Sequence, residues 1–191
     1  MWPPAHQVRY RYVLSPFLCY VPLASGLCLW AWRDPALPEL AKPASIAAGL
    51  LVWTFMEYLL HRFLLHYRPQ APALLAVIEK LHLGHHREPQ DEAKITVPVY
   101  GSLPIAGALL GLFRLMTGSW ELAALLMTGS IAGYLHYEAV HFWIHRGIRR
   151  GRWLRQRRTN HFFHHFTDQN RCFGVTTPLW DLVLGTYRVN S

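Results

Sequence analysis

Histidine is the residue type whose placement in this chain points most directly to chemistry. Ten of the twelve histidines fall in four short clusters, HRFLLH at 61–66, HLGHH at 82–86, HFWIH at 141–145 and HFFHH at 161–165. Two clusters share the pattern H-x-x-H-H. On a helix at about 100° per residue, this pattern puts three imidazoles within one arc. An arc of this width lets one helix supply ligands to two neighbouring metal ions.

The other two clusters differ in spacing. His141 and His145, at i and i+4, share a helix face and could approach one site together. His61 and His66 are five positions apart, about 140° around an ideal helix. Both can serve as ligands only if the helix distorts or ends there, or if they serve different metals.

The number of histidines narrows the kind of site. A structural zinc takes about four ligands and a catalytic zinc about three plus water, so ten exceed the needs of either. Two octahedral metals with about five imidazoles each would use all ten and leave positions open for a small ligand. Any single histidine is more simply a hydrogen-bonded polar residue, which is the reading we favour for His136. His6 also lies outside the clusters.

Carboxylates close to the clusters in sequence are candidates for holding the ligands. Ten neutral ligands leave the charge of two divalent cations uncompensated, so we expect acidic residues to accept the ring N–H groups. Glu57 lies one helical turn before His61 and is expected to orient it, although a purely interfacial carboxylate fits Glu57 equally well. The other candidates are Glu79, Glu138, Asp168 and Asp181.

Apolar segments of spanning length must position these residues. The chain is 52% hydrophobic, which is rich for a soluble protein, and residues 13–32 run without a charge for long enough to cross a bilayer. We expect four spans, at 13–32, 44–65, 95–117 and 119–140. The sequence therefore predicts one all-α domain, 1–191: an integral membrane four-helix bundle with a helical cap, at 66–94 and 145–191, that carries a histidine-rich dimetal site.

The distribution of charge orients this bundle. The net charge is +8, and nearly all Lys and Arg fall on the side that would hold the N-terminus and the cap. The positive-inside rule makes that side cytoplasmic. The basic run 146–158 is typical of a segment facing anionic headgroups, although a solvated basic face also fits. No nucleic-acid-binding motif accompanies it, so no nucleic-acid partner is expected.

Other sequence features exclude several classes. The three cysteines form no CxxC pattern, which excludes a zinc ribbon and a dithiol redox site. No cleavable signal peptide is expected at the N-terminus. No flavin, haem or iron–sulfur signature is seen in the sequence.

Five motifs together resemble the fatty acid hydroxylase superfamily, and most closely the membrane fatty acid 2-hydroxylases. They are E-Y-L-L-H-R-F-L-L-H at 57–66, H-L-G-H-H at 82–86, G-Y-x-x-Y-E-x-x-H-F-W-I-H at 133–145, H-F-F-H-H at 161–165 and F-G-V-T-T-P-L-W-D-L-V-L-G-T at 173–186. The likeness covers roughly residues 45–187. Nothing in the chain resembles the cytochrome b5 domain that is often fused to the eukaryotic relatives.

The resemblance implies an O2-dependent di-iron monooxygenase that hydroxylates a lipid acyl chain, with fatty acid or sphingolipid-type 2-hydroxylation as the expected reaction. Two iron ions are the expected cofactor, and zinc can replace them in purified material. The implied partners are the lipid, O2, the membrane and an electron donor such as a cytochrome b5 or a ferredoxin. The metal ligands carried over by position are His61, His66, His82, His85, His86, His141, His145, His161, His164 and His165.

Some roles around the site follow less directly. Trp180 and Asp181 are expected to anchor the C-terminal segment over the metals. Trp53, Phe55, Phe63 and Trp143 could line the approach of a lipid, although packing is the simpler role for each.

Three alternatives stay open. A carotenoid or sterol hydroxylase uses the same dimetal chemistry, and only the closing W-D-x-x-x-G-T pattern favours acyl chains. A fatty acyl desaturase usually shows three histidine boxes rather than four clusters. A non-enzymatic membrane metal-binding or transport protein would place its ligands near the bilayer midplane, whereas these gather at one end. A bacterial inner membrane, with the site facing the cytoplasm, is the expected location.

Overall fold

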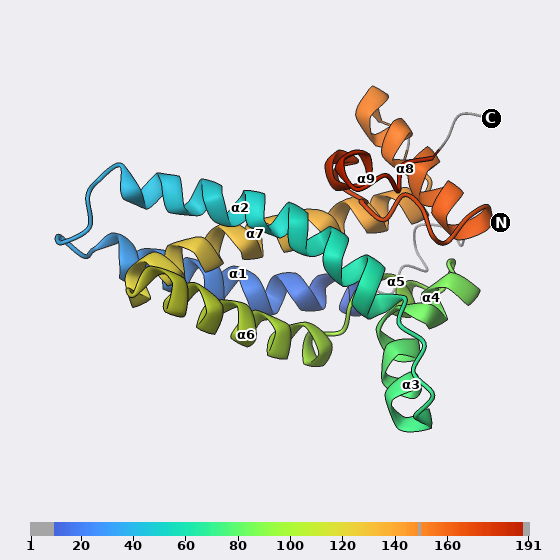
Figure 1. Ribbon diagram of the computed structural model, residues 1–191, viewed down its shortest axis with the longest axis horizontal. Helices are drawn as coiled ribbons and strands as arrows, with labels where there is room; N and C mark the ends of the chain where they lie inside the picture. Colours follow the sequence, from blue (N-terminus) through green and yellow to red (C-terminus); the bar gives the residue numbers. More distant parts are fainter. Residues whose placement is uncertain (1–9, 149, 189–191) are drawn as a thin grey trace. The chain divides into compact units, whose positions relative to one another are not determined.

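The computed structural model describes residues 10–148 and 150–188, and within these ranges it contains helices but no strand. Four long helices are α1 (Tyr10–Trp32), α2 (Ala41–Leu59), α6 (Val99–Thr117) and α7 (Trp120–His145) (Figure 1). The shorter helices are α3 (Pro72–Ile78), α4 (Gly84–Arg87), α5 (Glu92–Ile95), α8 (Gly151–Phe166) and α9 (Leu179–Val183). Two π-helices, η2 (Leu60–Leu65) and η3 (Glu79–Leu83), continue α2 and α3.

Three helical stretches of the described chain are long and apolar enough to cross a membrane: Tyr12–Trp32, Ala41–Leu65 and Glu92–Thr117. They coincide with three of the four expected spans. The fourth expected span, 119–140, falls in α7, which carries Glu121, His136 and Glu138 and does not reach the same apolar content. The chain is thus an all-helical membrane protein.

Contacts divide the chain into two compact units, each described by itself. The bundle unit comprises Leu14–Trp53 and Pro98–Leu135. The histidine unit comprises Thr54–Val97 and the described residues of 136–188, together with residues 10–13.

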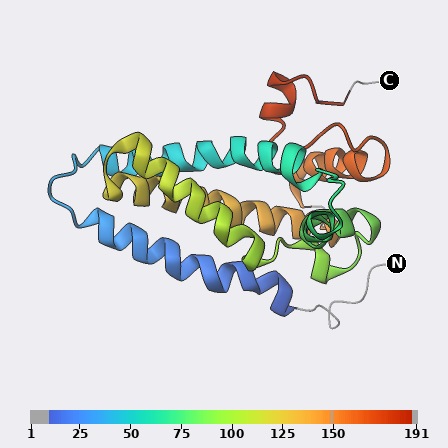
Figure 2. The ribbon, with the colours of Figure 1, turned by 60° about the horizontal axis from the view of Figure 1, so that its bottom comes forward.

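Glycines bring α2 and α7 into close contact within the bundle unit. A Cβ at Gly49 would overlap the backbone of Leu126, and one at Gly129 would overlap the backbone of Ile46. Ser130 donates a hydrogen bond of 3.0 Å from its hydroxyl to the carbonyl of Gly49. Small residues that let two backbones approach are typical of helix pairs in membranes. Figures 1 and 2 show the parts of α1, α2, α6 and α7 in this unit lying side by side.

The inside and the outside of the bundle unit have the residue pattern expected of a protein surrounded by lipid. Most α7 positions between Ala123 and Tyr134 are buried, and Tyr20 of α1 donates a hydrogen bond of 2.8 Å to Ser102 of α6. Leucines point outward instead; Leu18 and Leu115 are 73% and 83% exposed. An outward apolar surface is stable where the solvent is hydrocarbon.

The π-helices change the register of the histidines within the histidine unit. In η2 the backbone bonds run from i to i+5 rather than i to i+4, so residues five apart come close to the same face. This is the distortion that the spacing of His61 and His66 requires. η2 ends at Leu65, and His66 is the next residue.

Candidate metal centre

The ten clustered histidines form two groups of five. In each group every residue offers one ring nitrogen, and these nitrogens lie within 4.8 Å of one another. The first group is His61, His66, His82, His86 and His164; the second is His85, His141, His145, His161 and His165. All are buried except His66 and His86, which are half-buried.

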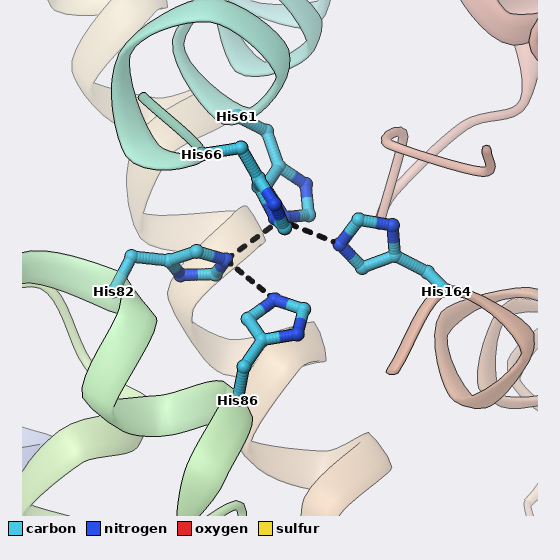
Figure 3. A group of neighbouring side chains, drawn as sticks. All are labelled: His61, His66, His82, His86 and His164. Atoms are coloured by element: carbon cyan, nitrogen blue, oxygen red, sulfur yellow. Dashed lines mark hydrogen bonds between the residues drawn. The ribbon is translucent and has the colours of Figure 1, made fainter. Parts of the chain in front are cut away.

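Separate parts of the chain supply the first group. The Nε2 atom of His82 lies 3.0 Å from that of His61 and 2.9 Å from that of His86. The Nε2 atoms of His66 and His164 are 3.0 Å apart. Figure 3 shows the five rings turned towards one another from the η2, η3–α4 and α8 parts of the chain.

The second group is equally tight. The Nε2 atom of His145 lies 3.0 Å from that of His85 and 2.8 Å from that of His161. The Nε2 atom of His141 is 3.1 Å from that of His161. The rings of His86 and His165 stack with centroids 4.1 Å apart, so the two groups adjoin.

Each H-x-x-H-H cluster contributes to both groups. In the cluster at 82–86 the outer histidines join the first group and the middle one, His85, joins the second. In the cluster at 161–165 the outer histidines join the second group and His164 joins the first. The three imidazoles that the sequence places within one arc of a helix are thus divided between two neighbouring groups.

Backbone carbonyls orient two of the rings. The Nδ1 atom of His61 lies 2.6 Å from the carbonyl oxygen of Phe173, and that of His164 lies 2.8 Å from the carbonyl oxygen of Arg171. A carbonyl only accepts, so Nδ1 carries the proton and the neutral ring keeps its lone pair on Nε2. In both residues Nε2 is the atom that faces the group.

The expectation that Glu57 orients His61 through a direct hydrogen bond to its ring is wrong. Both ring nitrogens of His61 have other partners. The carboxylate of Glu57 instead accepts the N–H groups of Val175 and Thr176, at 2.6 and 2.8 Å, and the hydroxyl of Thr176 at 2.5 Å. Its effect on His61 therefore passes through the loop that carries Phe173.

Asp181 holds the same loop from α9. Its carboxylate accepts the N–H groups of Phe173 and Gly174, at 2.9 and 2.8 Å, and the hydroxyl of Thr186 at 2.7 Å. The indole N–H of Trp180 donates to the hydroxyl of Thr54 at 3.0 Å. Trp180 and Asp181 thus anchor the C-terminal segment beside the histidines, as expected.

The other acidic candidates also bind the backbone or arginine rather than imidazole. Glu138 accepts the N–H of Val97 at 3.1 Å. Asp168 accepts the N–H of Asn170 and pairs with Arg171, whose carbonyl orients His164. Glu79 pairs with Arg87. These contacts brace the segments that carry the grouped histidines.

Burial favours the neutral form of the imidazoles outside the apolar helices. It lowers the pKa of His66 to about 3, with smaller contributions from His61 and Arg68. It also lowers the pKa of His82 and His161 well below the usual value. A neutral imidazole is the form that can bind a metal ion.

Outside the two groups, His136, Phe55 and Trp53 pack against other aromatic rings. His136 joins neither group and stacks on Trp153, with centroids 5.9 Å apart; His6 lies outside the described residues. Phe55 packs on Trp180, and Trp53 packs on Tyr134. The other two aromatics named above, Phe63 and Trp143, are 60% and 40% exposed.

The donor set fits two metal ions. Lone pairs on neighbouring Nε2 atoms repel one another unless a cation or a proton lies between them, and burial disfavours the extra proton. Five imidazoles suit iron, zinc, copper or nickel. The sequence could not reveal the carbonyls of Phe173 and Arg171, since every residue has a carbonyl and only the fold selects two of them.

The fold and the site define an all-helical membrane protein with two adjoining groups of five histidines. The chain belongs to the fatty acid hydroxylase family, whose pattern matches residues 46–186. Membership of this family supports an enzyme.

Individual relatives agree with this assignment. The chain is 32% identical over 180 residues to a dihydroceramide fatty acyl 2-hydroxylase of Arabidopsis thaliana, covering 90% of this chain and 69% of that protein. It is 31% identical over 159 residues to a fatty acid 2-hydroxylase of Rattus norvegicus, covering 81% of this chain and 42% of the relative. It spans less than half the length of the rat protein. Both relatives are eukaryotic and give no support to a bacterial inner membrane.

A solved structure shows the same fold. Full-length scs7p, of which only the hydroxylase domain is visible, matches with a TM-score of 0.85 and 26% identity. The match covers 93% of this chain and 67% of that one.

Proposed function

We propose that this chain hydroxylates a lipid acyl chain at C-2, using O2 and two iron ions held by the ten clustered histidines. The observation that carries the proposal is the convergence of ten imidazoles into two adjoining groups of five, in a member of the fatty acid hydroxylase family. The relatives named for fatty acid and dihydroceramide 2-hydroxylation support the choice of substrate and position.

The chain's own residues have distinct parts in this reaction. The carbonyls of Phe173 and Arg171 fix the rings of His61 and His164, while Glu57 and Asp181 hold the loop in place. Burial of most ligands keeps bulk water from the centre. The metal pair supplies the redox chemistry that acids and bases cannot provide for an unactivated C–H bond. A separate protein, such as a cytochrome b5 or a ferredoxin, supplies electrons.

The proposal includes a membrane topology. Four crossings, at 13–32, 44–65, 95–117 and 119–140, would leave the segments 66–94 and 145–191 as a cap on the cytosolic side. Three apolar helices and the distribution of Lys and Arg support this arrangement.

Metal analysis combined with lipid profiling tests the proposed function. In a host supplied with iron and a competent electron donor, we expect about two metal ions per chain and new 2-hydroxylated acyl chains. His165→Ala should abolish the product and leave membrane insertion intact. His136→Ala is the matched control, since His136 joins neither group, and should keep the product.

Other outcomes would select the competing functions. Hydroxylated carotenoid or sterol rings, with unchanged acyl chains, would contradict the acyl substrate. A protein that binds only zinc under these conditions and changes no lipid would contradict the enzyme.

A further inference from the structure

The short helix α9 exposes a continuous apolar surface. Leu179, Leu182, Val183 and Leu184 are 41%, 59%, 62% and 46% exposed, whereas Asp181 is 1% exposed. Asp181 is the only charged residue between Cys172 and Tyr187, and its carboxylate is turned inward to the loop at 173–174. The exposed side of α9 therefore carries no charge. Water is a poor solvent for such a surface.

The exposed side of α8, in the same unit, has the opposite chemistry. Apart from Trp153 and Phe166, its exposed side chains are polar or charged: Arg152, Arg155, Gln156 and Thr159. One unit therefore presents one surface suited to water or headgroups and another suited to hydrocarbon.

Contacts place α9 against an apolar helix of spanning length. Trp180 donates to Thr54 and packs on Phe55 with ring centroids 4.6 Å apart. Both partners belong to the apolar stretch Ala41–Leu65. Thr54 lies about 15 Å before the end of this stretch, at roughly 1.5 Å per residue. Figures 1 and 2 both show α9 beside the later part of α2.

We propose that α9, although part of the cap, is embedded in the adjoining leaflet of the bilayer, with its leucine and valine side chains in contact with lipid acyl chains beside α2. Lipid fits better than a second protein chain, because four partly exposed side chains offer far less than the roughly 800 Å² per partner of a stable interface. The proposal goes beyond the hydroxylase function and does not depend on it.

The placement has a consequence for the candidate centre. Asp181 lies on the inward side of α9 and holds Phe173, whose carbonyl orients His61. The loop that orients a histidine of the first group would therefore be fixed to an element immersed in lipid.

Spin-label accessibility in vesicles tests the proposal on the full chain. Leu182→Cys carries a nitroxide label in a background with Cys19→Ser and Cys28→Ser; Cys172 is buried, and the background alone shows whether it reacts. The matched control is Thr159→Cys, on the exposed side of α8. In phosphatidylcholine vesicles we expect the label at 182 to collide several-fold more with O2 than with a water-soluble nickel chelate. The label at 159 should show the reverse.

Two results would overturn the proposal. Free access of the nickel chelate to position 182, as at 159, would place α9 in water. Protection of position 182 from both reagents would mean that protein covers it. Val183→Cys repeats the measurement should Leu182→Cys fail to fold. The same depth is expected with His165→Ala added, which separates this result from the fate of the proposed reaction.

Discussion

Glu57 and Asp181 show how single residues act on a metal centre that they do not touch. Both carboxylates bind the loop at 173–176, one from α2 and one from α9. The loop in turn presents the carbonyl of Phe173 to His61. Each carboxylate replaces water for several buried donors, so its removal would leave those donors without an acceptor.

Glu57→Ala is predicted to loosen the first histidine group. Three donors from Val175 and Thr176 lose their acceptor, at about 1–3 kcal/mol for each buried group left unpaired. We expect a lower thermal unfolding temperature and faster loss of metal to a chelator, both measured on purified protein in detergent. Glu57→Gln keeps a carbonyl oxygen for the two backbone donors and should lie between wild type and Glu57→Ala. Wild-type rates of metal loss in Glu57→Ala would contradict this role.

For the helices, the sequence was sufficient to predict where the long ones lie, but it did not predict all of their local geometry. Long apolar runs with few charges predicted α1, α2 and α6, because a spanning helix needs such a run. The spacing of His61 and His66 allowed a distorted helix, a helix end or two different metals, and the fold has the π-helix η2 at this place. Most of α7 is buried, so its polar residues Glu138, His141 and His145 lie inside the protein. No sequence rule assigned His85 and His164 to opposite groups, since that depends on how α4 and α8 pack.

Gly129→Ala is predicted to separate α2 from α7. Its Cβ would overlap backbone atoms of Ile46 and Leu50, which cannot move as a side chain can. We expect a fall in thermal stability and in the yield of folded protein, measured by size-exclusion chromatography of detergent extracts. Gly111→Ala in α6 is the matched control, because nothing lies within 4 Å of its added Cβ. There alanine should be neutral or stabilising by about 0.5–1 kcal/mol through helix propensity. Equal loss in both variants would argue against close α2–α7 contact.

For the whole molecule, the two units should respond differently to metal. All ten grouped histidines belong to the histidine unit and none to the bundle unit. A metal that binds only the folded state stabilises it by about 4 kcal/mol at a free concentration one thousand times its Kd. Without metal, the closely spaced imidazole lone pairs have no shared partner, which favours local opening of the segments that carry them.

Hydrogen exchange after metal removal is therefore predicted to rise in one unit only. Peptides from α8 (Gly151–Phe166) should lose protection when a chelator strips the protein, and recover it when iron is restored. Peptides from α6 (Val99–Thr117) should change little, because that helix is held by its buried residues Ser102, Leu109 and Phe113 and carries no grouped histidine. His165→Ala protein, which already lacks one ligand, should respond less in α8. Equal loss of protection in α6 and α8 would mean that the metal supports both units as one cooperative structure.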